Sequence, residues 1–326
     1  MHQQYSLPSH KNCRRVIFFI SVMNGNAYTI SDQIELLKRR GMLFKDETKA
    51  YSQLEKIGYN RLKGYWLDMQ SDFNLHIFRT DVYFEDIIER YCFDRQLRII
   101  LFDAIEQIEI AFRAKMIYHL SIAYGGLWYL NPSLFESTII TQKGETKTAH
   151  FFALDELQKE FNRSQDIFTK DRKTEQNPDA WIIMESASMG TLSKLYKNLK
   201  NKLPEKASIA NEMGLNSTFT FVGWIESITL IRNMIAHHSR LWNRPMVKHP
   251  SMQLKNPAGA WLTRSLQPQQ LNKPFAIISC MVYFCNHLNQ SEDIKQKIIA
   301  LTNSFPNIPL YKYGFPNHWR NEPLWK

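Results

Sequence analysis

The sequence predicts an all-α protein. Its long patterned segments carry apolar residues three or four positions apart, which is typical of helices with one buried face, and they lack the strict alternation of strands. Only 12 Gly and 13 Pro occur among 326 residues, so the chain is not loop-dominated. A hydrophobic content of 44% is enough for a substantial core. We therefore expect a helical bundle with peripheral helices and no sheet larger than a hairpin.

Two short helices are expected near the start of the chain. Ser31 is a suitable N-cap for the first, which Gly41 would stop. The second runs from about Asp46 to Ile57 and ends at Gly58. Residues 59–66 follow.

Segment 59–66 mixes aromatic residues with Arg61 and Lys63. This mixture suits stacking on bases and contact with phosphates, although aromatic residues beside a helix end more often only pack. Both interpretations stand at this point.

The longest predicted helix runs from about Phe84 to Tyr124 and ends at Gly125. Its apolar row at helical spacing is Leu97, Ile100, Leu101, Ala104, Ile105, Ile108, Ala111 and Phe112. Glu109 and Arg113 are four residues apart on this helix, so we expect a structural salt bridge between them.

The middle of the chain alternates loops and helices. Residues 137–150 are polar and rich in threonine, which favours a flexible loop. A helix is expected at about 151–168. Another begins with Thr191 as N-cap and ends before Pro204. A short helix follows at 207–213.

The net charge is +10, from 41 Lys and Arg against 31 Asp and Glu, which favours a polyanionic partner: nucleic acid first, an anionic membrane second. A solvated helix face is the ordinary explanation for any single basic cluster. The basic clusters are Lys38, Arg39 and Arg40; Lys194, Lys197, Lys200 and Lys202; and Arg240, Arg244 and Lys248.

Cysteine usage indicates a reducing cytoplasm, because four scattered cysteines are too few for a disulfide framework in a chain of this length. Cys280, Cys285 and His287 could suggest a metal site. The chain has neither a C-x-x-C pair there nor a second histidine at ligand spacing, so we assign no metal.

The N-terminus faintly imitates a secretory signal, because basic residues precede the apolar run Val16–Met23. The run is at the short limit for a signal, no cleavage site follows, and a membrane span needs ~20 apolar residues. The simplest interpretation is that Met23 is an alternative start and residues 1–23 are a dispensable extension.

Residues Phe221 to Trp242 fit the pattern of one helix that carries an unusual polar stripe. At about 100° per residue, Asn233, His237, Arg240 and Arg244 fall within one narrow sector. The stripe holds no carboxylate, so we expect an anionic partner for it.

Arg232 lies about 140° from His237 on an ideal helix, so one straight helix cannot make the two converge. A distorted helix, the reach of the arginine side chain, or a second copy across a two-fold axis would each solve this.

The run Arg232-Asn233-Met234-Ile235-Ala236-His237 matches the R-x4-H motif of HEPN ribonucleases, and the wider RNMIAHHSRLWNR resembles Abi-like (AbiD/AbiF) abortive infection proteins. The segments SDQIELLKRRG, IGYNRLKGYW, FDRQLR with DAIEQIEIAFRAK, GTLSKLYKNLK and GFPNHWRNEPLW extend this resemblance over about residues 30–326. We accordingly divide the chain into the extension 1–23, a short-helix region 24–83 and an HEPN-like domain 84–326.

The resemblance implies an all-helical fold, RNA cleavage without a metal or other cofactor, and action as a growth-arresting toxin during phage infection. It also implies kinship with the HEPN nuclease modules of type VI CRISPR effectors, and control of some relatives by a structured non-coding RNA. The chain departs from the pattern in its N-terminal extension and at residues 163–166, where a more distinctive Ser-x-Glu-like pattern is expected.

RNA carries its own nucleophile in the 2′-hydroxyl, so the protein must accept a proton, donate one and stabilise the charged phosphorane. His237 is our candidate base, because histidine exchanges protons near neutral pH. Arg232 would bind the scissile phosphate and Asn233 would orient His237 or a phosphate oxygen. Arg240 and Arg244 would hold flanking backbone, whereas His238 is a packing or surface residue.

Further RNA contacts are expected from Lys194, Lys197, Lys200, Arg61 and Lys63. A homodimer is expected too, since one motif supplies one histidine and the reaction benefits from two proton-handling groups. The alternative is a non-catalytic RNA-binding module that holds a regulatory RNA. A membrane-associated protein is a third interpretation, which the lack of a strongly amphipathic basic helix disfavours.

Overall fold

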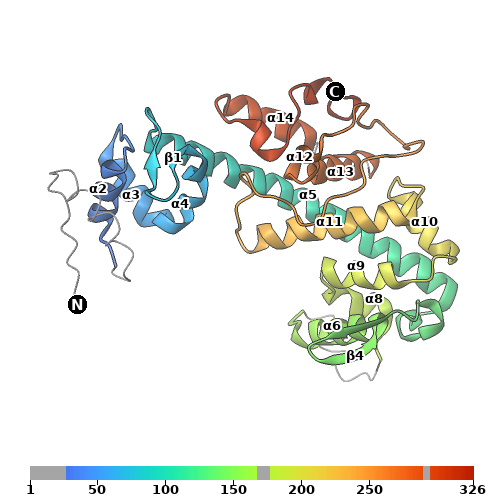
Figure 1. Cartoon of the computed structure of the whole chain (residues 1–326). Helices are drawn as coiled ribbons and strands as arrows, with labels where there is room; N and C mark the ends of the chain where they lie inside the picture. The colour runs from blue at the N-terminus through green and yellow to red at the C-terminus, as the bar shows by residue number, and fades with distance from the viewer. Residues whose placement is uncertain (1–26, 167–176, 289–293) are drawn as a thin grey trace, which may run out of the picture. The chain divides into compact units, whose positions relative to one another are not determined.

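The computed structural model describes residues 27–166, 177–288 and 294–326 (Figure 1). This part of the chain is mainly helical, and its strands form two separate antiparallel pairs. The predicted fold class is confirmed. The extension 1–23, with Val16–Met23, lies outside the described residues.

The described part of the chain divides into two compact units, with the boundary between Cys92 and Phe93. The division falls inside the long helix. The helices and strands of the first unit, before the long helix, are α2 (Ile30–Arg39), α3 (Glu47–Ile57), α4 (Tyr59–Trp66), β1 (Gln70–Asp72) and β2 (Ile77–Phe78).

The N-cap of helix α2 lies two residues before the predicted one. Thr29, not Ser31, is the N-cap: its side chain accepts the Asp32 N–H at 3.2 Å, and the Asp32 carboxylate accepts the Thr29 N–H at 3.2 Å. This reciprocal pair satisfies two free donors, which Ser31 could not do. Gly41 and Gly58, both with positive φ, end α2 and α3 as expected.

Helix α5 spans Phe84–Tyr124, as predicted, and continues into the second unit. The remaining elements of that unit are β3 (Ile139–Gln142), β4 (Glu145–Thr148), α6 (Ala149–Arg163), α8 (Ala180–Ile183), α9 (Met189–Asn198), α10 (Pro204–Glu212), α11 (Thr218–Ala236), α12 (Pro268–Leu271), α13 (Pro274–His287) and α14 (Ile294–Ser304), with short 3-10 turns between them.

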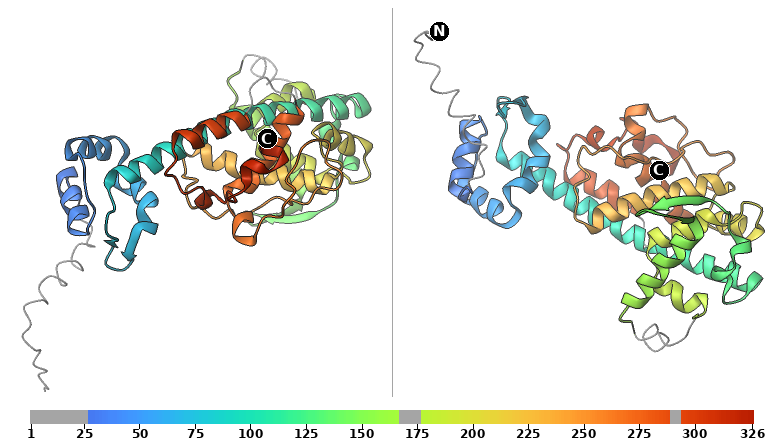
Figure 2. Two further views of the ribbon diagram at one scale, coloured as in Figure 1. Left: turned by 90° about the horizontal axis from the view of Figure 1, so that it is seen from above. Right: turned by 60° about the horizontal axis from the view of Figure 1, so that its bottom comes forward.

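Aromatic packing places α11 between α5 and α13. The Phe221 ring of α11 lies 5.4 Å from Phe112 of α5 and 5.8 Å from Phe284 of α13. Every residue of α13 from Pro274 to Cys285 is buried, so this helix forms the centre of the core. Helix α14 reaches α5, where Lys297 donates to Asp103 at 2.9 Å (Figure 2).

Residues 137–150 are not the predicted loop: they form the β3–β4 hairpin and the start of α6. Lys143 and Gly144 take φ of 50° and 83°, the pair of positive values that a tight two-residue turn requires. The hydroxyls of Thr141 and Thr146 meet across the strands at 2.9 Å. The local turn chemistry outweighed the polar composition.

The boundaries of α6, α9 and α10 also differ from expectation. Helix α6 ends at Arg163 rather than near 168. Ser188, not Thr191, caps α9, because its side chain accepts the Thr191 N–H at 3.3 Å. Pro204 opens α10 instead of ending α9, since a proline fits the first turn of a helix without losing a hydrogen bond. No helix in the described ranges is both long and apolar enough to cross a membrane.

Candidate functional site

Helix α11 ends at Ala236, not at Trp242 as predicted. The His238 N–H donates to the Ile235 carbonyl and the Ser239 N–H to the Met234 carbonyl, both at 2.8 Å. This is a Schellman ending in which His238 takes the left-handed position, with φ 54°. His237 is the C-cap residue.

The predicted stripe of four polar side chains on one helix is therefore wrong. Asn233 lies in the last turn of α11 and His237 caps it, but Arg240 and Arg244 lie in the loop beyond. Asn233 and His237 are both exposed.

The loop after α11 is anchored by a buried carboxylate, Asp94 of α5, whose side chain is 0% exposed. Its Oδ1 accepts the N–H groups of Leu241 at 3.0 Å and Trp242 at 2.7 Å, and the Tyr313 hydroxyl at 2.9 Å. Its Oδ2 accepts from Arg98 Nε at 3.2 Å. Asp94 thus fixes the chain a few residues beyond His237.

Sequence reasoning gave Asp94 no role. The usable signal was its position four residues before Arg98 on a predicted helix, the spacing of an ion pair. The backbone N–H groups that donate to Asp94 lie far along the chain. No local sequence pattern therefore predicts these hydrogen bonds.

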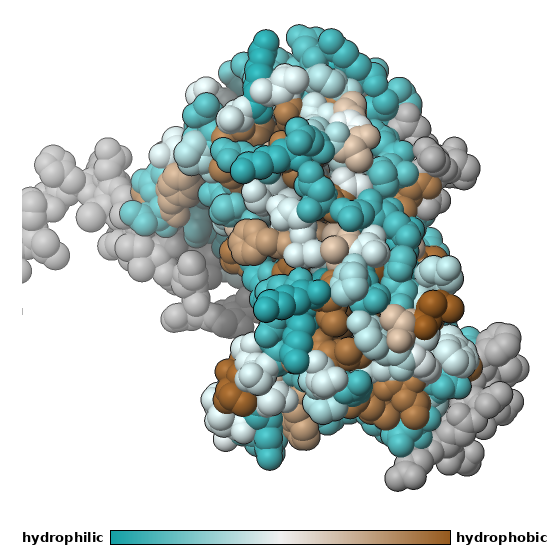
Figure 3. Space-filling model, turned by 90° about the vertical axis from the view of Figure 1, so that its right-hand side faces the viewer, coloured by the Kyte–Doolittle hydropathy of each residue, from teal (hydrophilic) through white to brown (hydrophobic). Residues whose placement is uncertain are grey.

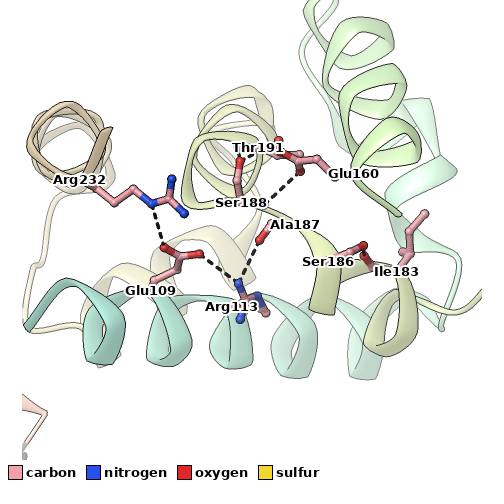
Figure 4. A network of polar contacts seen from close by, with 9 residues as sticks. All are labelled: Glu109, Arg113, Glu160, Ile183, Ser186, Ala187, Ser188, Thr191 and Arg232. Atoms are coloured by element: carbon pink, nitrogen blue, oxygen red, sulfur yellow. Dashed lines mark hydrogen bonds and ion pairs between the residues drawn. The ribbon is translucent and has the colours of Figure 1, made fainter. Parts of the chain in front are cut away.

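Arg232 and Arg113 share one carboxylate, that of Glu109 (Figure 4). Arg113 lies 3.1 Å from Glu109, which confirms the predicted salt bridge, and it also donates to the Ala187 carbonyl at 2.9 Å. The Arg232 Nε lies 3.8 Å from Glu109, and 32% of the Arg232 side chain stays exposed. The Glu109 carboxylate therefore lies between two guanidinium groups.

Burial raises the pKa of Glu109, while the charges of Arg113 and Arg232 lower it. The network continues to the start of α9, where Glu160 accepts the Ser188 N–H at 3.0 Å (Figure 4). Arg232 therefore projects from a braced surface made by α5, α9 and α11.

The structure brings Arg232 to Glu109, not to His237. Within the described chain no hydrogen bond or ion pair joins Arg232 to His237, whose backbone N–H donates to the Asn233 carbonyl at 3.1 Å. A joint action of Arg232 and His237 on one phosphate therefore still requires the reach of the arginine side chain, a distortion of the helix or a second copy of the chain.

Arg240 lies among other cations. It donates to the Trp242 carbonyl of its own loop. Burial lowers the pKa of Lys273, and the positive charges of Lys312 and Arg240 lower it further. Arg244 is half-buried in the same loop. This concentration of positive charge borders the chain segment that follows His237.

The α9 lysines are exposed but mostly paired within the protein. Lys194 pairs with Glu156, and Lys197 lies 2.8 Å from Glu226, which also meets Lys248 at 3.2 Å. Lys200 is exposed beyond the end of α9. Exposed pairs of this kind contribute only about 0–1 kcal/mol, so a polyanion can displace them at low cost.

Arg61 and Lys63 lie on α4 in the first unit. Arg61 is exposed, with its guanidinium carbon 6.0 Å from the Tyr91 ring centroid, and Lys63 is half-exposed. Tyr65 and Trp66 are each only 1% exposed. Base stacking is therefore wrong for these two rings, which pack in the core.

Among the residues described, no three His, Cys, Asp or Glu side chains are grouped so that they could hold a metal ion. The arrangement is that of a helical protein with a cationic, solvent-facing cluster at the end of one central helix. A family model described as Abi-like protein matches residues 52–243, more than half of the chain. The chain therefore belongs to the Abi-like family, and this membership indicates a role in abortive infection, a form of phage defence. No curated protein and no solved structure matches the chain.

Proposed function

We propose that this protein is a metal-independent HEPN-type endoribonuclease that acts as a toxin in abortive infection. The observation that carries the proposal is the end of α11. There His237 caps the helix with its side chain exposed, and Arg232, five residues earlier, is held by Glu109 with a third of its side chain exposed.

In the proposed reaction the RNA 2′-hydroxyl attacks the neighbouring phosphorus and the bond to the 5′-oxygen breaks. His237 takes the proton of the 2′-hydroxyl, for which an exposed imidazole is well suited. Arg232 binds the non-bridging phosphate oxygens and stabilises the charge that grows on them. Asn233, exposed on the last turn, would orient the phosphate or His237.

The Glu109 pair supports a phosphate-binding role for Arg232. At 3.8 Å it is long for an ion pair, and Arg113 already holds the same carboxylate at 3.1 Å. A phosphate can therefore take the Arg232 contact without leaving Glu109 unpaired. Glu109 and Arg113 are positioning residues in this scheme, and Arg240 and Arg244 hold the flanking backbone.

A homodimer belongs to the proposal, because a second copy would bring another Arg232 and His237 to the same RNA and supply the second proton-handling group. A protein that is monomeric at the concentration of the assay and still cleaves RNA would contradict the proposed dimer.

The test uses purified protein and RNA in EDTA. Cleavage should leave a 2′,3′-cyclic phosphate or its opened form and a 5′-hydroxyl, and 2′-deoxy substitution at the cut position should block it. His237→Ala should abolish cleavage and keep RNA binding, whereas Arg232→Ala should reduce both. His238→Gly is the matched control, since glycine suits a φ of 54°.

An essential His238 with a dispensable His237, or a need for a divalent ion, would overturn the assignment. RNA binding without cleavage would favour the alternative, a module that holds a regulatory RNA. Expression from a tight promoter gives the cellular counterpart: the wild type should arrest growth and His237→Ala should not.

A further inference from the structure

A cavity of about 940 Å³ lies beside the first turns of α11. Its walls come from the beginning of α11, the end of α9 and the loop 249–266. We infer that this cavity binds one nucleotide of single-stranded RNA at a distance from the cut phosphate. The inference rests on the proposed function in taking RNA as the substrate.

The cavity and Asn233 share one face of α11. Phe219 and Glu226 line the cavity, and Asn233 follows at the same seven-residue interval. Seven residues nearly complete two turns, so the three side chains stay in register to within about 20° per step. At a rise of about 1.5 Å per residue, Phe219 and Asn233 lie roughly 21 Å apart. A strand that follows this face therefore passes both places.

Positive charge predominates around the cavity. Lys206 is 1% exposed, and its Nζ donates to the carbonyls of Lys197 at 3.2 Å and Leu199 at 2.6 Å and to Asn201 Oδ1 at 2.9 Å. These three acceptors stabilise the ammonium form, although burial lowers the pKa of Lys206 to about 8.

Two further lysines, Lys197 and Lys248, share the single carboxylate of Glu226 at 2.8 and 3.2 Å. Arg264 lines the cavity with 64% of its side chain exposed and only a 4.0 Å contact to Glu322. This cationic rim is suited to a backbone phosphate.

The cavity wall also offers aromatic surface. Phe219 is 84% exposed, an unusual state for a phenylalanine, while Trp261 is nearly buried against Trp224 with ring centroids 5.0 Å apart. The Trp261 indole donates to the Met252 carbonyl at 2.9 Å, which fixes that wall. Figure 3 shows that apolar side chains interrupt the hydrophilic surface only in separate patches on the face drawn there.

An exposed ring beside fixed cations is the combination that binds single-stranded nucleic acid, in which the base stacks and the phosphate pairs. The cavity volume also falls in the range of sites for small organic ligands. RNA is the occupant that the observations favour, since the cavity continues the face that carries Asn233.

The experiment uses the His237→Ala protein, so that labelled single-stranded RNA is bound without being cut. Phe219→Ala is compared with Val247→Ala, because these side chains are 84% and 85% exposed and only Phe219 lines the cavity. Arg264→Ala is compared with Arg95→Ala, an exposed arginine outside the cavity. Fluorescence anisotropy at several salt concentrations gives Kd and its salt dependence.

Phe219→Ala should raise Kd about fivefold or more at every salt concentration, the equivalent of losing one stacked base. Arg264→Ala should lower the slope of log Kd against log salt by about one, and both controls should match the parent. Equal Kd values and slopes for cavity variants and controls would overturn the inference, as would failure of the parent to bind RNA.

Cleavage by the wild-type protein separates the two claims. If RNA is cut but the cavity variants behave like their controls, the inference fails and the proposed function stands. If the cavity variants weaken binding as expected but the wild type leaves RNA intact, the proposed function fails and the nucleotide site stands.

Discussion

Asp94→Asn tests how firmly the loop after α11 is anchored. The substitution keeps the shape of the side chain and one acceptor oxygen for the Leu241 and Trp242 N–H groups and the Tyr313 hydroxyl. It removes the negative charge opposite Arg98, whose side chain is only 7% exposed. The guanidinium would then be buried without a counter-charge.

Removing one partner of a buried ion pair costs about 3–5 kcal/mol. We therefore expect Asp94→Asn to lower the free energy of unfolding by roughly that amount, and the melting temperature by on the order of 10 °C. Because the anchored loop follows His237 directly, RNA cleavage should fall as well, even at temperatures where the variant is folded.

The measurement is urea unfolding followed by tryptophan fluorescence and circular dichroism. Asp155→Asn is the matched control, because Asp155 pairs with Lys159 four residues away, as Asp94 does with Arg98, but is 45% exposed. Its loss should cost less than about 1 kcal/mol. Adding Arg98→Met to Asp94→Asn should recover most of the lost stability. A cost equal to that of the control would refute the reasoning.

Three further predictions concern single elements. His238→Gly should raise the free energy of unfolding by roughly 1 kcal/mol, because glycine has no Cβ to strain the left-handed position with φ 54°; thermal melts that show a loss would contradict this. The Lys206 pKa of about 8 lies below its usual 10.5, so between those pH values the unfolded chain binds the extra proton. The free energy of unfolding of the wild type should therefore rise relative to that of Lys206→Met as pH rises from about 8 to 10.5, by up to about 3 kcal/mol. A difference between the denaturant midpoints of the two proteins that stays constant over this pH range would contradict the prediction. Replacing Lys197 and Lys200 by alanine should weaken RNA binding equally for all sequences and lower its salt dependence. Unchanged Kd values would mean that these lysines are ordinary solvated surface residues without a role in RNA binding.

Local signals predicted the elements that local physics controls. Helix α5 was predicted with its observed bounds, Phe84–Tyr124, because a long apolar row meets Gly125, which can take the left-handed backbone that ends a helix. Asp46 and Gly58 bounded α3 in the same way. The Glu109–Arg113 pair followed from four-residue spacing.

The prediction was wrong where the decisive residue lacked its usual signature. The end of α11 was missed because His238, rather than glycine, takes the left-handed position. The 143–144 turn was missed because lysine is an uncommon residue at positive φ, although Gly144 supplied half of the signal.

The sequence by itself determined the helical class, the family and the positions of Arg232, Asn233 and His237 in a cationic chain, because these depend on periodicity, composition and motif spacing. Only the tertiary structure decided what those residues meet. Arg232 contacts the carboxylate of Glu109, and Asp94 binds the loop beyond His237. A cavity lies along the face of α11 that carries Asn233. The contacts of Arg232 with Glu109 and of the loop with Asp94 join residues more than a hundred positions apart in the sequence, and only the packing of the helices brings them together.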